Sequence, residues 1–222
     1  MVSNLSGEAG SSPSTNRVSP QRWLRYRNRL MPDCGTLPHS APRRPVCDRT
    51  TLNGMEHRTT DLLALAEQLA KERHAGQTDK AGAAYWMHPQ RVSQGCASDE
   101  ARIAGWLHDL IEDTDTTAEE LLTLGFPPDV VAAVQLDTRR VDESYMDYIQ
   151  RIVDACDSQD PAVARAGRIA REVKMSDLRD NMNLDRLQTV TDTDRARVEK
   201  YRAAYSVLEN SCAPAPGIDA TR

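Results

Sequence analysis

The segment that most constrains the fold, residues 98–113, repeats its apolar residues at the three-and-four spacing of an α-helix that buries one face. These apolar residues are Ile103, Trp106, Leu107, Leu110 and Ile111. The same segment carries four side chains that can bind a cation or move a proton: His108, Asp109, Glu112 and Asp113. Positions four apart share a face at about 100° per residue, so all four project from one arc beside the buried stripe. Because three crowded carboxylates repel one another, the segment predicts a site where a cation or water compensates them.

Helical patterns continue through the chain from Met55 onward, with few β-branched runs and no alternating strand pattern. We expect the first helix to begin at Thr60 or Asp61, and a short one to open at His88-Pro89, since proline suits a first turn. Further helices are predicted from the capping residues Thr116-Thr117, from Pro127-Pro128, and over residues 143–156, 160–182 and 191–209. The predicted fold class is all-α, a bundle of about seven or eight helices.

Composition divides the chain into three expected parts. Residues 1–54 are rich in Ser, Pro and Arg, and we expect a disordered tail there. An organelle-targeting segment, or a true start at Met55, would also explain this composition. Residues 55–210 form the predicted domain, and residues 211–222 a flexible C-terminal tail.

The distribution of charge argues against nucleic acid as a partner. Residues 1–54 have eight arginines, no lysine and three acidic residues, whereas the remainder has 20 basic and 30 acidic residues. So acidic a domain is a poor general binder of phosphate backbones. No apolar stretch is long enough to span a membrane, and five scattered cysteines indicate no disulfide framework. We expect a cytoplasmic protein without a nucleic-acid or membrane partner; no feature specifies an oligomeric state.

Asp177 is the best downstream candidate for a site residue. The apolar stripe of the helix over residues 160–182 continues, at helical spacing, into Asp177 and Asn181. A carboxylate on a core-facing stripe needs a partner or a metal, although a helix end that reaches the surface would explain the pattern equally well. Since no histidine lies beyond His108, any distant metal ligand is a carboxylate, apart from His74 and His88 upstream. The stripe consists of Ala166, Ile169, Ala170 and Val173.

Several motifs in order resemble the HD-domain phosphohydrolases, most closely the RelA/SpoT-type alarmone hydrolase domain and its small stand-alone relatives. The first are His74-Ala75-Gly76-Gln77, followed by Lys80-Ala81-Gly82 and Tyr85, and then His88-Pro89. The others are Leu107-His108-Asp109-Leu110-Ile111-Glu112-Asp113-Thr114 and Lys174-Met175-Ser176-Asp177-Leu178-Arg179-Asp180-Asn181. The resemblance covers residues 60–208 approximately and implies an HD-domain helical bundle.

The resemblance also implies roles for individual residues. It implies one divalent metal, usually manganese, for which Fe²⁺ and Zn²⁺ are chemical alternatives. The implied metal ligands are His88, His108, Asp109 and Asp177. Glu112 and Asp113 are implied to position or deprotonate the attacking water. We expect Lys80, Asn181 and Arg140 to contact substrate, Arg140 from a stretch that differs from the family's.

The implied substrate is a small nucleotide. Alarmone hydrolases of the stringent response remove the 3′-pyrophosphate of guanosine tetra- or pentaphosphate, and we expect this reaction here. One residue departs from the pattern: the position before Lys80, typically an arginine packed on the guanine, is Asp79. Two alternatives therefore stay open, namely hydrolysis of another nucleotide or phosphate monoester, and a non-catalytic nucleotide- or protein-binding module on an HD scaffold. Since no synthetase or regulatory domain follows, we do not expect a bifunctional enzyme.

Overall fold

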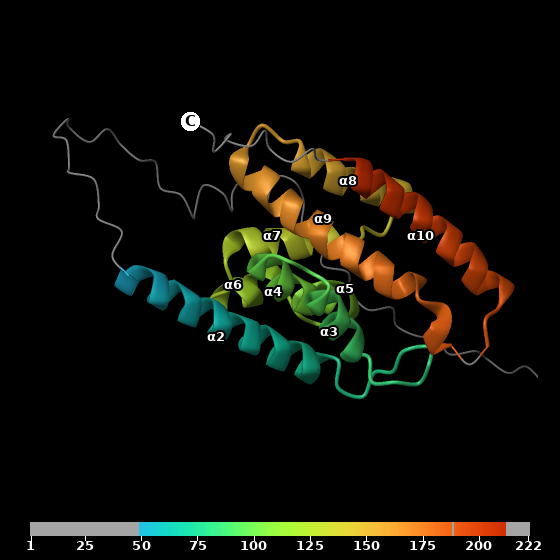
Figure 1. Ribbon diagram of the computed structural model, residues 1–222, viewed down its shortest axis with the longest axis horizontal. Coiled ribbons are helices and arrows are strands. Elements are labelled where there is room, and N and C mark those ends of the chain that lie inside the picture. Colours follow the sequence, from blue (N-terminus) through green and yellow to red (C-terminus); the bar gives the residue numbers. More distant parts are fainter. Residues whose placement is uncertain (1–48, 188, 212–222) are drawn as a thin grey trace, which may run out of the picture. The chain divides into compact units, whose positions relative to one another are not determined.

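The computed structural model describes residues 49–187 and 189–211, with side chains from residue 59 onward (Figure 1). The predicted tails at 1–48 and 212–222 lie outside the described residues. Within the described part the all-α prediction is confirmed, because the elements are helices apart from one isolated bridge between Thr78 and Ala84. The helices are α2 (Arg49–Arg73), α3 (Met87–Gln94), α4 (Asp99–Leu107), α5 (Leu110–Asp113), α6 (Ala118–Thr123), α7 (Pro128–Asp137), α8 (Tyr145–Cys156), α9 (Pro161–Met182), the 3₁₀-helix η1 (Leu184–Arg186) and α10 (Asp192–Asn210).

Helix α2 begins earlier than the sequence pattern predicted. It starts at Arg49 rather than at Thr60 or Asp61, and therefore also before the expected boundary at Met55. The prolines of the N-terminal region end at Pro45, so no residue between 49 and 59 lacks a backbone N–H or blocks a helix. Residues 49–54, which we had assigned to the tail, are thus helical.

Helix α9 is the central element of the described domain. Figure 1 shows it running between α8 and α10 on one side and α3, α4 and α7 on the other, and each of these five helices contacts it. Helix α2 packs separately against α4. A continuous cluster of buried side chains, including Leu107, Leu110, Phe126 and Tyr148, fills the space between the helices. The position of α9 explains why its inward side chains meet residues from several elements.

The inward face of α9 is the apolar stripe predicted from the sequence. Ile169, Ala170 and Val173 are at most 6% exposed, and the face continues into Ser176 and Asp177, each 4% exposed. The Ser176 hydroxyl donates to the backbone oxygen of Val92 at 2.8 Å, which fastens α9 to α3. Helical spacing therefore carries a buried apolar surface directly into a buried carboxylate, and the alternative of a solvated Asp177 is wrong.

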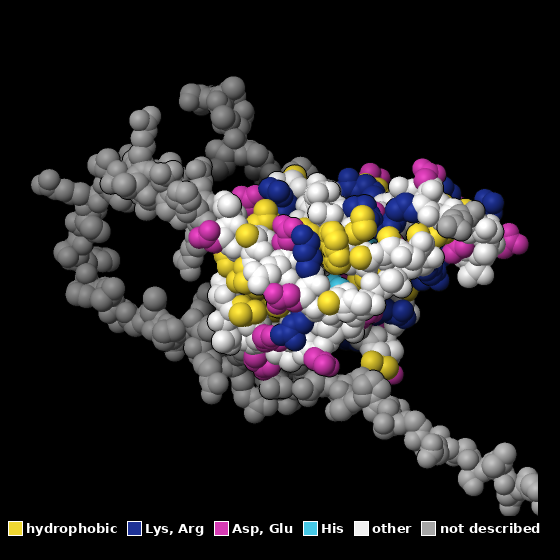
Figure 2. Space-filling view, turned by 90° about the horizontal axis from the view of Figure 1, so that it is seen from below, with side chains coloured by type: hydrophobic (Ala, Val, Ile, Leu, Met, Phe, Trp, Pro, Cys, Tyr) yellow, Lys and Arg dark blue, Asp and Glu magenta, His cyan; other side chains and the backbone are white. Residues whose placement is uncertain are grey.

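The surface of the described domain carries mixed charge. Figure 2 shows acidic and basic side chains interspersed over one face, with small groups of hydrophobic side chains between them. Among the described residues, no helix has the length and apolar character needed to cross a membrane.

Gly167 marks a close approach between α9 and α8. A Cβ atom at this position would lie less than 3.0 Å from backbone atoms of Ala155 and Cys156, which cannot rotate away. We therefore expect Gly167→Ala to lower the free energy of unfolding by about 1–3 kcal/mol, although alanine is otherwise the better helix former. Urea unfolding followed by circular dichroism measures the change. The exposed neighbour Arg168 supplies the control, because Arg168→Ala should stay within about 0.5 kcal/mol of the wild type. Equal stability of Gly167→Ala and wild type would contradict this packing.

Candidate active site

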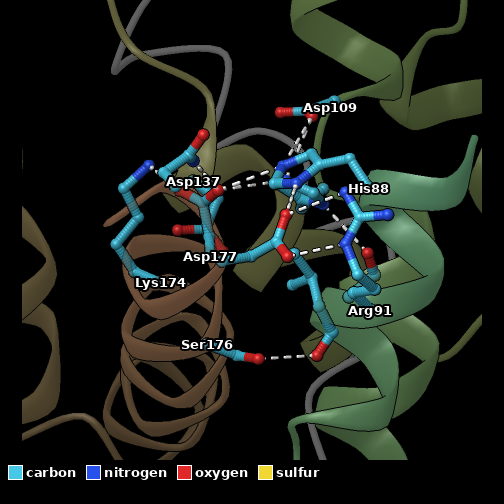
Figure 3. A network of polar contacts seen from close by, with 12 residues as sticks. His88, Arg91, Asp109, Asp137, Lys174, Ser176 and Asp177 are labelled. Carbon is cyan, nitrogen blue, oxygen red and sulfur yellow. Dashed lines mark hydrogen bonds and ion pairs between the residues drawn. The ribbon is translucent and has the colours of Figure 1, made fainter. Parts of the chain in front are cut away.

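Four side chains predicted as metal ligands converge between α3, the end of α4 and α9, and Figure 3 labels three of them, His88, Asp109 and Asp177. Nε2 of His108 lies 3.1 Å from Oδ2 of Asp109, and Nε2 of His88 lies 3.7 Å from the same oxygen. From the opposite helix, Oδ1 of Asp177 lies 3.1 Å from Nε2 of His88 and 3.9 Å from Nε2 of His108. The donor atoms of His88, His108 and Asp109 all lie within 4.8 Å of one another. Two imidazole nitrogens and two carboxylate oxygens thus face a common centre.

Both imidazoles are oriented so that Nε2 points to this centre. Nδ1 of His108 contacts the backbone oxygen of Gly105 at 2.9 Å, and Nδ1 of His88 contacts Oδ2 of Asp180 at 2.7 Å. Since both of these oxygens accept hydrogen bonds, Nδ1 of each ring donates to its own acceptor, and Nε2 is the nitrogen left to face the centre. Nε2 of His108 is buried without a hydrogen-bond partner among the described residues. The arrangement therefore fits a bound divalent cation, which takes neutral imidazole and carboxylate ligands.

The segment that carries His108 is not the single helix predicted from the sequence. Helix α4 ends at Leu107 and α5 begins at Leu110, so His108 and Asp109 form a turn between them. The His108 side chain bonds to the Gly105 carbonyl, which in an unbroken helix would accept from the backbone N–H of Asp109. The side chain thus competes with the backbone for one acceptor. The interruption leaves the backbone N–H of Asp113 bonded to Asp109 at 2.8 Å, so Asp113 still stands one turn beyond Asp109.

Glu112 and Asp113 lie at the edge of the same centre and line the same pocket as His88 and Asp177. Oε2 of Glu112 accepts from the backbone N–H of Arg139 at 3.1 Å. The Tyr85 hydroxyl lies 2.7 Å from Oδ2 of Asp109 and 3.2 Å from Oδ2 of Asp113, so a neutral hydroxyl separates two carboxylates. Burial raises the pKa of both Glu112 and Asp113, and the neighbouring charge of Asp109 acts in the same direction, although the hydrogen bond from the Arg139 backbone opposes the shift at Glu112.

Charge compensation dominates the centre itself. Burial alone would raise the pKa of Asp177, but Lys174 and His88 hold it well below its usual range. Burial similarly opposes ionisation of Asp109, and the contact with His108 outweighs it and lowers its pKa. For His88, burial is outweighed by hydrogen bonds to Asp177 and Asp180, which raise its pKa to about 10. The two carboxylates are therefore anionic and draw positive charge into the centre.

The centre opens into a pocket of about 480 Å³. Lys80 and Asn181, both predicted to contact substrate, line this pocket, and the Asn181 amide also donates to Oδ1 of Asp177. Arg140 does not line it, whereas its neighbour Arg139 does. The sequence pattern missed the lining residues that come from α8 and α10, among them Tyr145, Arg197, Lys200 and Tyr201.

Three of the lining cations have no carboxylate partner. Within the described residues, no carboxylate lies at ion-pair distance from Arg139, Arg197 or Lys200, and Arg139 instead donates to the backbone oxygen of Glu143. The Lys200 ammonium lies over the Tyr145 ring, 4.2 Å from its centroid. Burial, and then the nearby charges of Arg139 and Arg197, lowers the pKa of Lys200. An anion in the pocket would relieve this repulsion.

Asp79, the departure from the family pattern, contacts its own loop. Its Oδ1 accepts from the backbone N–H groups of Ala81 and Ala83, each at 2.9 Å. Its Oδ2 lies 3.4 Å from Nη1 of Arg186, which also lines the pocket. Asp79 therefore shapes the loop and holds a guanidinium beside the pocket, so the charge inversion in the sequence does not leave this wall without a cation.

Asp137 is a buried carboxyl that no sequence motif identified as a site residue. It is 5% exposed and lines the pocket, and its Oδ2 has no hydrogen-bond partner among the described residues. Burial raises the pKa of Asp137 to about 7, even though the charge of Lys174 acts in the other direction. Its carboxyl therefore holds a proton that the unfolded chain would release near pH 4.

This difference predicts a pH-dependent effect of Asp137→Asn. Folding of the wild type loses stability as the pH rises from about 4 to about 7, because only the folded state retains the proton in that range. The neutral amide avoids this loss, so we expect the stability of the variant relative to wild type to be higher at about pH 8 than at about pH 5. Thermal unfolding of metal-free protein, followed by circular dichroism, measures both. Asp154→Asn on α8, an exposed site, is the control and should behave alike at both pH values. A pH-independent effect of Asp137→Asn would contradict the argument.

Known proteins resemble the chain over short stretches of sequence. The chain is 45% identical over 60 residues to the guanosine-3′,5′-bis(diphosphate) 3′-pyrophosphohydrolase of Aquifex aeolicus (strain VF5), which is 25% of this chain and 9% of that protein. It is 41% identical over 63 residues to the protein of the same name from Spiroplasma citri, 27% of this chain and 8% of that protein. The match therefore spans less than a tenth of these curated relatives. No protein-family model matches the chain.

The fold is similar over a much larger part of the chain. A solved structure of a metazoan ortholog of SpoT, described as hydrolysing ppGpp and acting in starvation responses, matches with a TM-score of 0.53 and 22% identity. The match covers 68% of this chain and 88% of that one, and it confirms the predicted helical fold. In its fold, and in short stretches of sequence, the chain resembles the RelA/SpoT-type hydrolases, as its motifs predicted.

Proposed function

We propose that this protein is a metal-dependent phosphohydrolase that releases pyrophosphate from the 3′ position of guanosine tetra- or pentaphosphate. The observation that carries the proposal is the convergence of two imidazoles and two carboxylates on one centre, with Glu112 and Asp113 at its edge. The names of both curated relatives describe this reaction, and the SpoT ortholog of similar fold is described as hydrolysing ppGpp. These support the substrate, and the geometry supports the reaction type.

The proposed cofactor is one divalent metal ion held by His88, His108, Asp109 and Asp177. A mixed set of imidazole and carboxylate ligands favours Mn²⁺, with Fe²⁺ or Zn²⁺ as alternatives. When bound, such an ion lowers the pKa of a water molecule and offsets negative charge on phosphoryl oxygens. The chain's own contribution is to engage both Nδ1 atoms with acceptors, so that Nε2 of each ring is the nitrogen that would bind the ion.

Glu112 and Asp113 are the proposed groups that position and deprotonate the attacking water. The backbone N–H of Arg139 fixes one oxygen of Glu112, which leaves the other oxygen to accept a proton. Its raised pKa makes Glu112 a stronger base than an ordinary surface glutamate. Tyr85 holds Asp113 in the same manner through its hydroxyl. A positioned carboxylate of this kind contributes about 10²–10⁴-fold to a rate.

The cations of the pocket are proposed to bind the phosphate groups. Arg139, Arg197 and Lys200 have no carboxylate partner among the described residues, so they can pair with an anion without breaking an ion pair. Lys80 is only loosely held, 3.7 Å from Asp194, and joins them from the pocket loop. Asn181 is the proposed polar contact next to the metal ligand Asp177.

Pyrophosphate release from ppGpp in the presence of Mn²⁺ tests the proposal. We expect turnover by the wild type, its loss on treatment with EDTA, and recovery when Mn²⁺ is added back. Glu112→Gln should lower kcat by about 10²–10⁴-fold because the proton acceptor is removed while the four proposed ligands remain. Exposed Glu209→Gln on α10 is the matched control and should retain wild-type turnover. Turnover that persists in EDTA and in Glu112→Gln would contradict the proposed mechanism.

A second candidate function is hydrolysis of another nucleotide or phosphate monoester, and Asp79 favours it. Asp79 stands where alarmone hydrolases typically have an arginine that packs on the guanine, so this position offers no guanidinium to the base. Its carboxylate instead contacts its own loop and Arg186. A panel of ppGpp, pppGpp, guanosine and adenosine nucleotides and a simple phosphate monoester, assayed with Mn²⁺, separates the two functions. We expect kcat/KM to be highest for ppGpp or pppGpp. A higher value for any other member would favour the second function, and bound Mn²⁺ without turnover of any member would favour a non-catalytic module.

A further inference from the structure

Asp180 is an almost buried carboxylate that has contacts with side chains from two other elements, α3 and η1. Its side chain is 9% exposed, and it follows Asp177 by three residues on α9. Its Oδ2 lies 2.7 Å from Nδ1 of His88 on α3. Arg91, also on α3, donates to both of its oxygens, at 2.6 and 3.1 Å, and Nη2 of Arg186 on η1 donates at 3.1 Å. So many donors on one carboxylate indicate that its position is closely fixed.

Carboxylates from helix α9 therefore contact both ring nitrogens of His88. Asp177 faces Nε2 at 3.1 Å and Asp180 faces Nδ1 at 2.7 Å, and helical spacing puts the two carboxylates about one turn apart. The view in Figure 3 shows His88 and Arg91 projecting from α3 toward Asp177 on α9. An acceptor at Nδ1 determines which tautomer the ring adopts, and a negatively charged acceptor also makes Nε2 a stronger ligand.

The other histidine of the centre lacks such a partner. Nδ1 of His108 bonds to the neutral carbonyl of Gly105 within its own turn, which fixes the tautomer without adding negative charge. The basicity of the two imidazoles thus depends on different partners: a backbone carbonyl for His108 and a carboxylate for His88. His88 is also the ligand whose helix, α3, is short, with eight residues. Its orientation depends correspondingly on contacts from α9.

The arginines around Asp180 extend its contacts to the pocket loop. Arg186 donates to the backbone oxygen of Asp180 at 2.9 Å as well as to its carboxylate, and its other terminal nitrogen reaches Asp79. Asp79 in turn holds the turn that carries Lys80. A continuous set of ion pairs thus joins the loop beside the pocket to the imidazole of His88.

We propose that Asp180 is a positioning residue, which fixes the tautomer and orientation of His88 and thereby sets the affinity of the centre for its divalent ion. The proposal rests on the metal-dependent function proposed above, and it concerns this chain's own residues around that ion. Loss of such an outer carboxylate typically lowers metal affinity by about 10–100-fold. Arg91 and Arg186 serve to hold the carboxylate in place.

Titration of metal-free protein with Mn²⁺ tests the proposal. We expect Asp180→Asn to weaken the Kd for Mn²⁺ by about 10–100-fold, because a neutral amide can also turn its NH₂ group toward Nδ1 and favour the wrong tautomer. Asp180→Glu keeps the charge beside Arg91 and Arg186 and should restore most of the affinity. Asp185→Asn removes one exposed carboxylate from η1 and is the matched control, with an expected Kd equal to that of wild type. An unchanged Kd in Asp180→Asn would overturn the proposal.

A second measurement does not depend on whether Asp180→Asn folds. In wild-type protein loaded with diamagnetic Zn²⁺, ¹⁵N spectra of the imidazoles should show His88 bound to the ion through Nε2 and protonated at Nδ1. Coordination through Nδ1 would overturn the proposal. Both readouts are separate from ppGpp turnover: a wild type that binds Mn²⁺ but leaves ppGpp intact contradicts the proposed substrate, whereas an unchanged Kd in Asp180→Asn contradicts only the role of Asp180.

Discussion

Compensation of the buried charge of Asp177 is the interaction on which the site depends. An unpaired carboxylate at 4% exposure costs several kcal/mol, so it is stable only where positive or hydrogen-bonding groups surround it. Here those groups are His88 from α3, Lys174 and Asn181 from α9 itself, and His108 from the end of α4. The same demand that draws these side chains together also brings the candidate metal ligands to one centre. The geometry of the site therefore follows from one electrostatic requirement, within helices that an apolar core holds together.

Helical periodicity accounts for what could be predicted from the sequence. The spacing of residues 166–173 placed Asp177 on an inward face, because side-chain direction within a helix depends only on local geometry. It left open whether that face was covered, which depends on the packing of α3 and α4 against α9. The turn at His108 and Asp109 was missed for a related reason. It arises from a side chain that takes a backbone acceptor, and a hydrophobic pattern carries no information about such competition.

The substrate side of the pocket was harder to predict, since its residues come from elements distant in sequence. Arg197, Lys200 and Tyr201 lie on α10 and reach the pocket only because α10 packs along α9. Arg139 lines the pocket and Arg140 does not, because the conformation of the loop, and not the residue type, determines which arginine faces the pocket. Asp79 shows that a sequence pattern does not reveal distant neighbours. The motif indicates that an arginine beside the pocket has been replaced by an acid, whereas the fold brings Arg186 next to Asp79.

The pocket resolves an apparent conflict between an acidic domain and an anionic ligand. Charges beyond a Debye length of about 8 Å are largely screened at physiological ionic strength, so the groups lining the pocket matter more than the net charge of the chain. Those groups include carboxylates that attract a cation and unpaired cations that attract an anion. A polyphosphate alone would be repelled by Asp109 and Asp177, and a metal ion alone would leave Arg139, Arg197 and Lys200 uncompensated. A phosphate group bound to a divalent ion would satisfy both sets at once, which supports the ligand class of the proposed function.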